Sequence, residues 1–119
     1  MPILTRDAIL AAVDIKTETV AVPEWGGEVL VGAMNGAARD EWEQSLIRRV
    51  GSKSEPNLAN VRARLVAATV VDENGQRMFS ADDVEALGQK SSAALERVCK
   101  VAQRLNGLGD ADLEELKGN

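Results

Sequence analysis

The chain has 119 residues, of which 45% are apolar and 28% charged, and its formal net charge is −5. This length and apolar fraction predict one globular domain and exclude a disordered tail. Because the chain has no histidine and a single cysteine, Cys99, an intrachain disulfide and the usual four-ligand zinc site are both excluded.

The N-terminal stretch predicts a short helix and no targeting signal. Residues 8–13 are all apolar, and either Asp7 or Thr5 is expected to be their N-cap. The basic residue follows the first apolar cluster, which is not the order of a secretory signal peptide, and no apolar run is long enough to span a bilayer. We therefore expect a cytoplasmic protein with no membrane partner, in which residues 1–6 and 109–119 are flexible.

Residues 19–34, TVAVPEWGGEVLVGAM, predict a β-hairpin. Apolar residues alternate along each arm, as in a half-buried strand, and form the pairs Val20 with Val22 and Val29 with Val31. Between the arms, Gly26 and Gly27 tolerate a positive φ at little cost. Because an isolated hairpin is marginally stable in water, we expect this one to pack against the rest of the chain.

Trp25 lies at the turn of this hairpin and is one of three aromatic residues in the chain. Two interpretations stay open. In the first, Trp25 is exposed and anchors a protein partner, as aromatic residues often do at interfaces. In the second, it folds back onto the helix that carries Trp42 and closes one end of the core.

Residues 38–50 predict an amphipathic helix that begins at Asn35 or Gly36, because asparagine is a favoured N-cap. Its apolar residues recur every four positions and form one stripe, which consists of Ala38, Trp42, Leu46 and Val50. Gly51 is expected to end the helix, and residues 51–57, GSKSEPN, to form a loop.

Residues 58–68 predict the next helix, because Leu58, Val61, Leu65 and Ala68 follow a helical spacing. The β-branched run 69–71 and residues 77–79 then predict two short strands, which the turn signal Asn74–Gly75 would join into a small second hairpin.

Two further helices are predicted toward the C-terminus. Ser80 with Asp83 resembles a capping box and starts a short helix that ends at Gly88. Ser91 or Ser92 caps the last long helix, whose inner face is expected to hold Leu95, Val98, Cys99, Ala102 and Leu105.

Beyond that helix, Asp110 is expected to cap a short final turn. The predicted fold class is therefore α+β: a mostly helical small single domain over residues 1–119, with an N-terminal β-hairpin and a second short hairpin.

Catalytic chemistry is not favoured by any pattern in the chain. Without histidine, the commonest general base near neutral pH is missing. Cys99 lies on an apolar helix stripe, which predicts a core residue, and the adjacent acids Asp82 and Asp83 are more simply explained as capping residues. The stretch around Gly75 does not match a calcium-binding EF-hand loop in any register. We expect no enzyme, cofactor or metal, and the acidic balance argues against nucleic acid.

A specific order of motifs runs through residues 20–108. The hairpin motif VPEWGG leads into the acidic helix GAARDEWE, the helix VRARLVA leads to VDENGQRMF, and AQRLNGL follows near the end. This order resembles the tail assembly chaperones of long-tailed phages and their prophage relatives.

The resemblance implies a helper protein without catalytic activity. Such chaperones bind the long helical tape-measure protein, keep it soluble while the tail tube forms, act in the host cytoplasm and are absent from the finished virion. They can recruit the major tail protein, self-associate and occur in a second, frameshifted length. From side-chain chemistry, the partner contact is expected at Trp25, Val29, Val31 and Trp42. An alternative is a small cytoplasmic adaptor or regulatory domain that binds a peptide at the hairpin edge.

Overall fold

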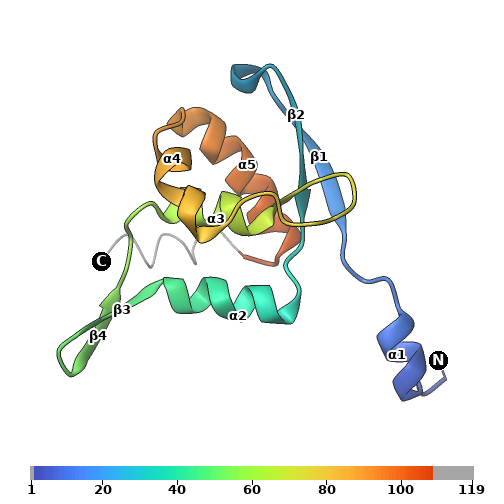
Figure 1. The fold of residues 1–119 in the computed structure, drawn as a ribbon. Helices are drawn as coiled ribbons and strands as arrows, with labels where there is room; N and C mark the ends of the chain where they lie inside the picture. The colour runs from blue at the N-terminus through green and yellow to red at the C-terminus, as the bar shows by residue number, and fades with distance from the viewer. Residues whose placement is uncertain (1, 109–119) are drawn as a thin grey trace.

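The computed structural model describes residues 2–108. It has the predicted α+β architecture, with a β-hairpin near the N-terminus followed mainly by helices (Figure 1). The elements are α1 (Arg6–Ala11), β1 (Thr17–Val22), η1 (Pro23–Trp25), β2 (Gly27–Gly32), α2 (Gly36–Ser45), β3 (Ile47–Val50), β4 (Lys53–Pro56), α3 (Val61–Thr69), β5 (Val70–Val71), η2 (Ala81–Asp83), α4 (Val84–Gly88) and α5 (Ser92–Leu105).

The N-terminal hairpin is confirmed as the first part of a three-stranded antiparallel sheet in the order β1-β2-β5. Val20 pairs with Val29, and Leu30 pairs with Val71. Gly26 takes a positive φ of 76° at the turn, whereas Gly27 does not. Helix α5 runs beside the hairpin (Figure 1).

One core joins the hairpin to the helices. The side chains with no exposed surface include Val22 and Val31 on the hairpin, Leu65 and Val66 on α3, and Val98 on α5. The expected inner face of the last helix is confirmed, because four of its five members are buried and Leu105 is partly buried against the same core.

The caps inferred from sequence are present. Asn35 Oδ1 accepts a hydrogen bond from the Ala38 N–H at 2.8 Å, and Ser91 caps α5 through the Ala94 N–H. Ser80 and Asp83 form the predicted capping box. Of the two candidates for α1, Thr5 is the cap, with its Oγ1 3.2 Å from the Ala8 nitrogen.

The helix predicted over residues 38–50 and the loop predicted over 51–57 are wrong beyond Ser45. Helix α2 ends there, and β3 and β4 form a second hairpin in which Val50 pairs with Lys53. Ile47 and Val50 are 57% and 53% exposed, so neither belongs to a buried stripe. Gly51 has a φ of 64° and turns this hairpin instead of ending a helix. The physical reason is that β-branched residues favour strands and that Gly51 can adopt the conformation of a tight turn.

Two further boundaries differ from the prediction. Helix α3 begins at Val61 instead of residue 58, after Asn60 in a left-handed conformation. The predicted small hairpin over residues 69–79 forms only in part: Val71 and Arg77 make a single bridge, and the Met78 N–H donates to the Val70 carbonyl at 3.1 Å. On its other edge, β5 pairs with β2. The predicted turn at Asp110 lies outside the described residues.

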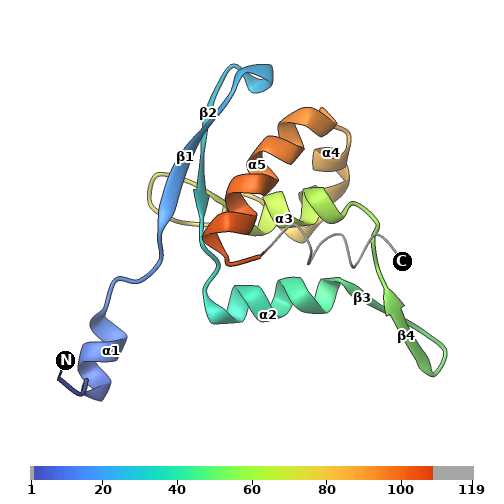
Figure 2. The same ribbon diagram turned by 180° about the vertical axis from the view of Figure 1, so that it is seen from behind.

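Two segments project from the body of the protein. Helix α1 and the β3–β4 hairpin extend from it in different directions, as the two opposite views show (Figures 1 and 2). No residue of α1 is buried. Within residues 2–108, no helix has both the length and the apolar character that crossing a membrane requires.

Candidate functional site

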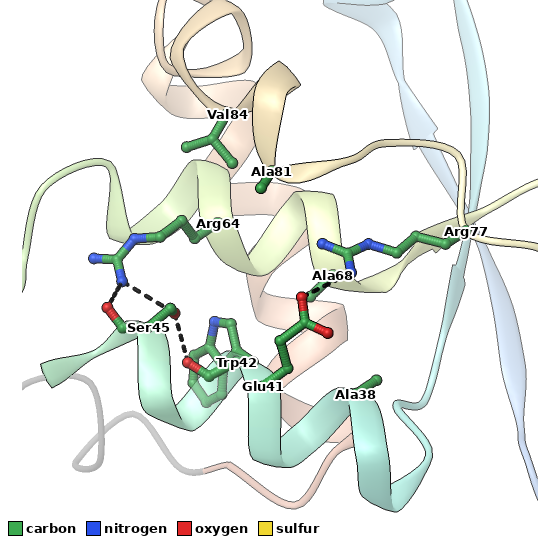
Figure 3. Close-up of a pocket in the computed structure, with 9 residues that line it drawn as sticks. All are labelled: Ala38, Glu41, Trp42, Ser45, Arg64, Ala68, Arg77, Ala81 and Val84. Atoms are coloured by element: carbon green, nitrogen blue, oxygen red, sulfur yellow. Dashed lines mark hydrogen bonds and ion pairs between the residues drawn. The ribbon is translucent and has the colours of Figure 1, made fainter.

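A pocket of about 210 Å³ opens between α2, α3 and the segment that leads from β5 into α4 (Figure 3). Its apolar lining comes from small side chains on four elements: Ala38 on α2, Ala68 on α3, Ala81 on η2 and Val84 on α4. Small residues at these positions leave room that larger side chains would fill. The polar lining includes two arginines and one glutamate.

Trp42 lines this pocket and carries an unpartnered donor. Its side chain is 5% exposed, and no acceptor among residues 2–108 binds its buried Nε1. In Figure 3 the nitrogen edge of the indole points from α2 toward α3. A buried donor without an acceptor destabilises the folded protein by about 1–3 kcal/mol.

Arg64 connects three segments beside the indole. Its Nε donates to the Ala59 carbonyl at 3.0 Å, Nη1 donates to the carbonyl and hydroxyl oxygens of Ser45, and Nη2 donates to the Asn57 carbonyl. Burial lowers the pKa of Arg64, but an arginine stays charged in proteins. In the described part of the chain, no carboxylate forms an ion pair with this guanidinium.

Arg77 enters the pocket from the opposite side. Its Nε donates to the Ala67 carbonyl at 2.9 Å, and its Nη1 lies 3.8 Å from a carboxylate oxygen of Glu41. That distance exceeds a hydrogen bond, and the Glu41 side chain is 74% exposed. The pocket therefore holds two guanidinium groups and one loosely held carboxylate, in a chain whose net charge is negative.

The four residues expected to bind a partner do not form one surface. Trp25 and Val29 are half-buried on the hairpin and pack against the core, whereas Val31 has no exposed surface. Trp42 is buried on α2, which lies away from the hairpin tip (Figures 1 and 2). Beside Trp25, Glu24 binds Arg97 on α5, so the hairpin tip faces α5 and not the helix that carries Trp42.

Sequence reasoning missed an exposed apolar segment around α1. Ile3, Leu4, Leu10 and Val13 are between 63% and 99% exposed, and nothing in residues 2–108 covers them. The sequence pattern that could have shown this is the run of six apolar residues at 8–13, which places apolar side chains on every face of a helix. A stable helix of that kind is normally buried against other protein. Contiguous apolar surface of this kind commonly marks an interaction site.

Two features that catalysis often uses, a metal-binding cluster and an accessible thiol, are not found in the part of the chain that the structure describes. Within residues 2–108, no group of three or more acidic or thiol side chains is placed to hold a metal ion. The Cys99 side chain is 1% exposed, and its Sγ lies 3.5 Å from the Arg62 carbonyl. A thiol in that position has no access to a substrate.

Comparison with known proteins gives two results that agree with each other. A family model described as phage tail assembly chaperone matches residues 5–119. The solved structure of the bacteriophage HK97 tail assembly chaperone has a TM-score of 0.59 and 23% sequence identity, over 87% of this chain and 95% of that chain. At this identity, the likeness to that structure shows a shared fold. None of the curated protein sequences matches the chain.

Proposed function

Because the chain belongs to the phage tail assembly chaperone family, we propose that it binds the tape-measure protein and keeps it soluble while the tail assembles. The single observation that carries this proposal is the family match, which spans residues 5–119. The proposed activity is binding without catalysis or cofactor, in the host cytoplasm, by a protein that does not remain in the virion. The major tail protein and a second copy of the chain are further proposed partners.

The physical properties of the chain support a role in shielding apolar surface. A tape-measure protein is a long amphipathic helix, and its apolar face is exposed until the tube closes around it. The segment around α1 offers exposed Leu10 and Val13 for such a face. The net charge of −5 favours solubility of a complex.

Of the four residues proposed for the contact, Trp25 and Val29 are the ones that a partner reaches without unfolding, since both are half-buried. Val31 has no exposed surface and would act by holding the hairpin against the core. Trp42 is 5% exposed and lines the pocket, so a partner that contacts it would do so there.

Co-expression tests the proposal directly. The tape-measure protein of the same phage is expressed alone and together with this chain, and the measurement is the fraction that stays in the supernatant and co-purifies. We expect co-expression to keep the tape-measure protein soluble. If it precipitates equally with and without the chain, the proposed function is wrong.

A pair of variants tests the contact on the hairpin. Trp25→Ala is expected to reduce co-purification, whereas Met78→Ala, at an apolar side chain that is 52% exposed elsewhere on the surface, leaves it unchanged. Retention of the tape-measure protein by folded Trp25→Ala at the wild-type level would remove Trp25 from the contact.

A further inference from the structure

We propose that the pocket between α2, α3 and η2 binds the carboxylate of an aspartate or glutamate side chain that an amphipathic helix of the partner presents. This inference rests on the proposed function and adds to it the chemistry that the site recognises. Its starting point is the unpartnered Nε1 of Trp42, an indole that is buried and lines the pocket.

The donors around the pocket select a group that only accepts hydrogen bonds. Trp42 Nε1 can only donate, and the guanidinium groups of Arg64 and Arg77 add further N–H donors on either side of the pocket. Arg64 uses protein carbonyl and hydroxyl oxygens and has no ion pair within residues 2–108. An incoming carboxylate would therefore meet positive charge that the protein has not neutralised.

A side chain fits these donors better than a backbone carbonyl does. Inside a helix the carbonyl groups are already bonded within the helix itself, so the acceptor that a helical partner offers must come from its side chains. The small residues Ala38, Ala68 and Ala81 leave a cavity of about 210 Å³. That space accommodates the aliphatic part of an acidic side chain, with apolar neighbours on the partner helix covering the rim.

Glu41 acts as the internal competitor for this site. Its carboxylate lies 3.8 Å from Arg77 Nη1, too far for a hydrogen bond, and its side chain is mostly exposed. An incoming carboxylate displaces Glu41 from Arg77 and takes a closer position. Since Nε1 is shielded from solvent in the free protein, the bound carboxylate reaches it through a small shift of the indole, which the unpaired donor favours.

Three substitutions separate this mechanism from nonspecific attraction. Trp42→Phe removes the donor and keeps the ring, Arg77→Gln removes one cation, and Glu41→Gln removes the competing carboxylate. The matched control is Arg48→Gln, which removes an exposed arginine on the β3–β4 hairpin. Each variant is compared with wild type for its affinity for the tape-measure protein, and its melting temperature establishes that it is folded.

We expect Trp42→Phe and Arg77→Gln to weaken binding about tenfold each, the effect of losing one charge-assisted contact. Glu41→Gln is expected to strengthen binding severalfold, and Arg48→Gln to leave it unchanged. A second probe is an array of 20-residue peptides that covers the tape-measure protein. Peptides that bind are expected to lose affinity when their acidic residues are replaced by the matching amides.

The outcomes distinguish this inference from the proposed function. If wild type and all four variants retain the tape-measure protein equally, the carboxylate site is wrong and the chaperone function stands. Peptides that keep their affinity after amide replacement lead to the same conclusion. If wild type itself does not retain the tape-measure protein, both proposals are overturned.

Discussion

Arg97 on α5 and Glu24 at the tip of the β1–β2 hairpin form a two-point ion pair, although 73 positions separate them in the chain. The Nη2 to Oε2 distance is 3.1 Å. Toward the other end of β1, Arg104 on the same helix lies 2.5 Å from Glu18. The two arginines lie about two helical turns apart and so face the same side of α5. These pairs connect the hairpin to the helix at two points.

The Glu24 pair predicts a dependence of stability on pH. The hydrogen bond from Arg97 lowers the pKa of the Glu24 carboxyl below its ordinary value of 4.5. Because the pKa of this carboxyl is lower in the folded than in the unfolded protein, the ion pair stabilises the fold fully at pH values above the unfolded-state pKa. That stabilisation is lost as the pH falls through the folded-state pKa. The melting temperature of Glu24→Gln is therefore expected to lie below that of wild type at about pH 7. The difference is expected to shrink when the measurement is repeated in acid, as the carboxyl becomes protonated in the folded protein.

The control for this measurement is Glu28→Gln, an exposed glutamate on the same hairpin that has no ion pair within the described residues. Its melting temperature is expected to follow wild type at both pH values. The effect at Glu24 is small because both partners are partly exposed. A difference for Glu24→Gln that stays constant with pH would assign its effect to packing instead of charge.

The adjacent glycines at the hairpin turn are predicted to respond differently to substitution. Gly26 has a φ of 76°, in the left-handed region that disfavours a side chain, whereas Gly27 has neither a positive φ nor any atom within 4 Å of an added Cβ. We expect Gly26→Ala to lower the free energy of unfolding by about 1–2 kcal/mol, and Gly27→Ala to change it by less than about 0.5 kcal/mol. Urea unfolding measures both, and equal effects would contradict the turn geometry.

Trp42 is predicted to tolerate one aromatic substitution and not the loss of its ring. Trp42→Ala leaves a cavity beside the core, and we expect it to lower the free energy of unfolding by about 3–5 kcal/mol. Trp42→Phe removes the unpaired Nε1 and keeps most of the aromatic ring. We expect it to lower the free energy of unfolding far less than Trp42→Ala does. The reason is that removing the unpaired donor stabilises the folded protein by about 1–3 kcal/mol, which offsets the lost packing. Chemical denaturation distinguishes the two. Equal destabilisation by both would contradict the offset assigned to the removed donor.

The caps and the first hairpin were predictable from sequence because their signals are local. Asn35 and Ser91 each bond to a nitrogen three residues later, and alternation of apolar residues identifies a strand pair whatever else surrounds it. The end of α2 was missed because Leu46 and Val50 continue a four-residue spacing that a helix also shows. The strand pairing of Val50 with Lys53 overrides this local pattern.

The candidate pocket was not predictable in the same way. Its residues come from four elements and from the segment that carries Arg77, so their proximity depends on how α2 packs against α3. The sequence identified Trp42 as apolar and Arg64 as charged, but an unpaired Nε1 is a property of three-dimensional surroundings. In the same way, local pattern could not tell that residues 2–108 would leave the apolar side chains of α1 exposed.

Exposed apolar residues near α1 are predicted to affect binding without affecting stability. Val13 is 99% exposed, so Val13→Ser removes no packing, and we expect the free energy of unfolding to change by less than about 0.5 kcal/mol. The matched variant Val22→Ser places the same change at a side chain with no exposed surface, where a cavity and a buried hydroxyl are expected to cost more than about 2 kcal/mol. Co-purification of the tape-measure protein is expected to fall in Val13→Ser although the protein stays fully folded. If Val13→Ser retains the tape-measure protein at the wild-type level, this valine does not take part in the contact.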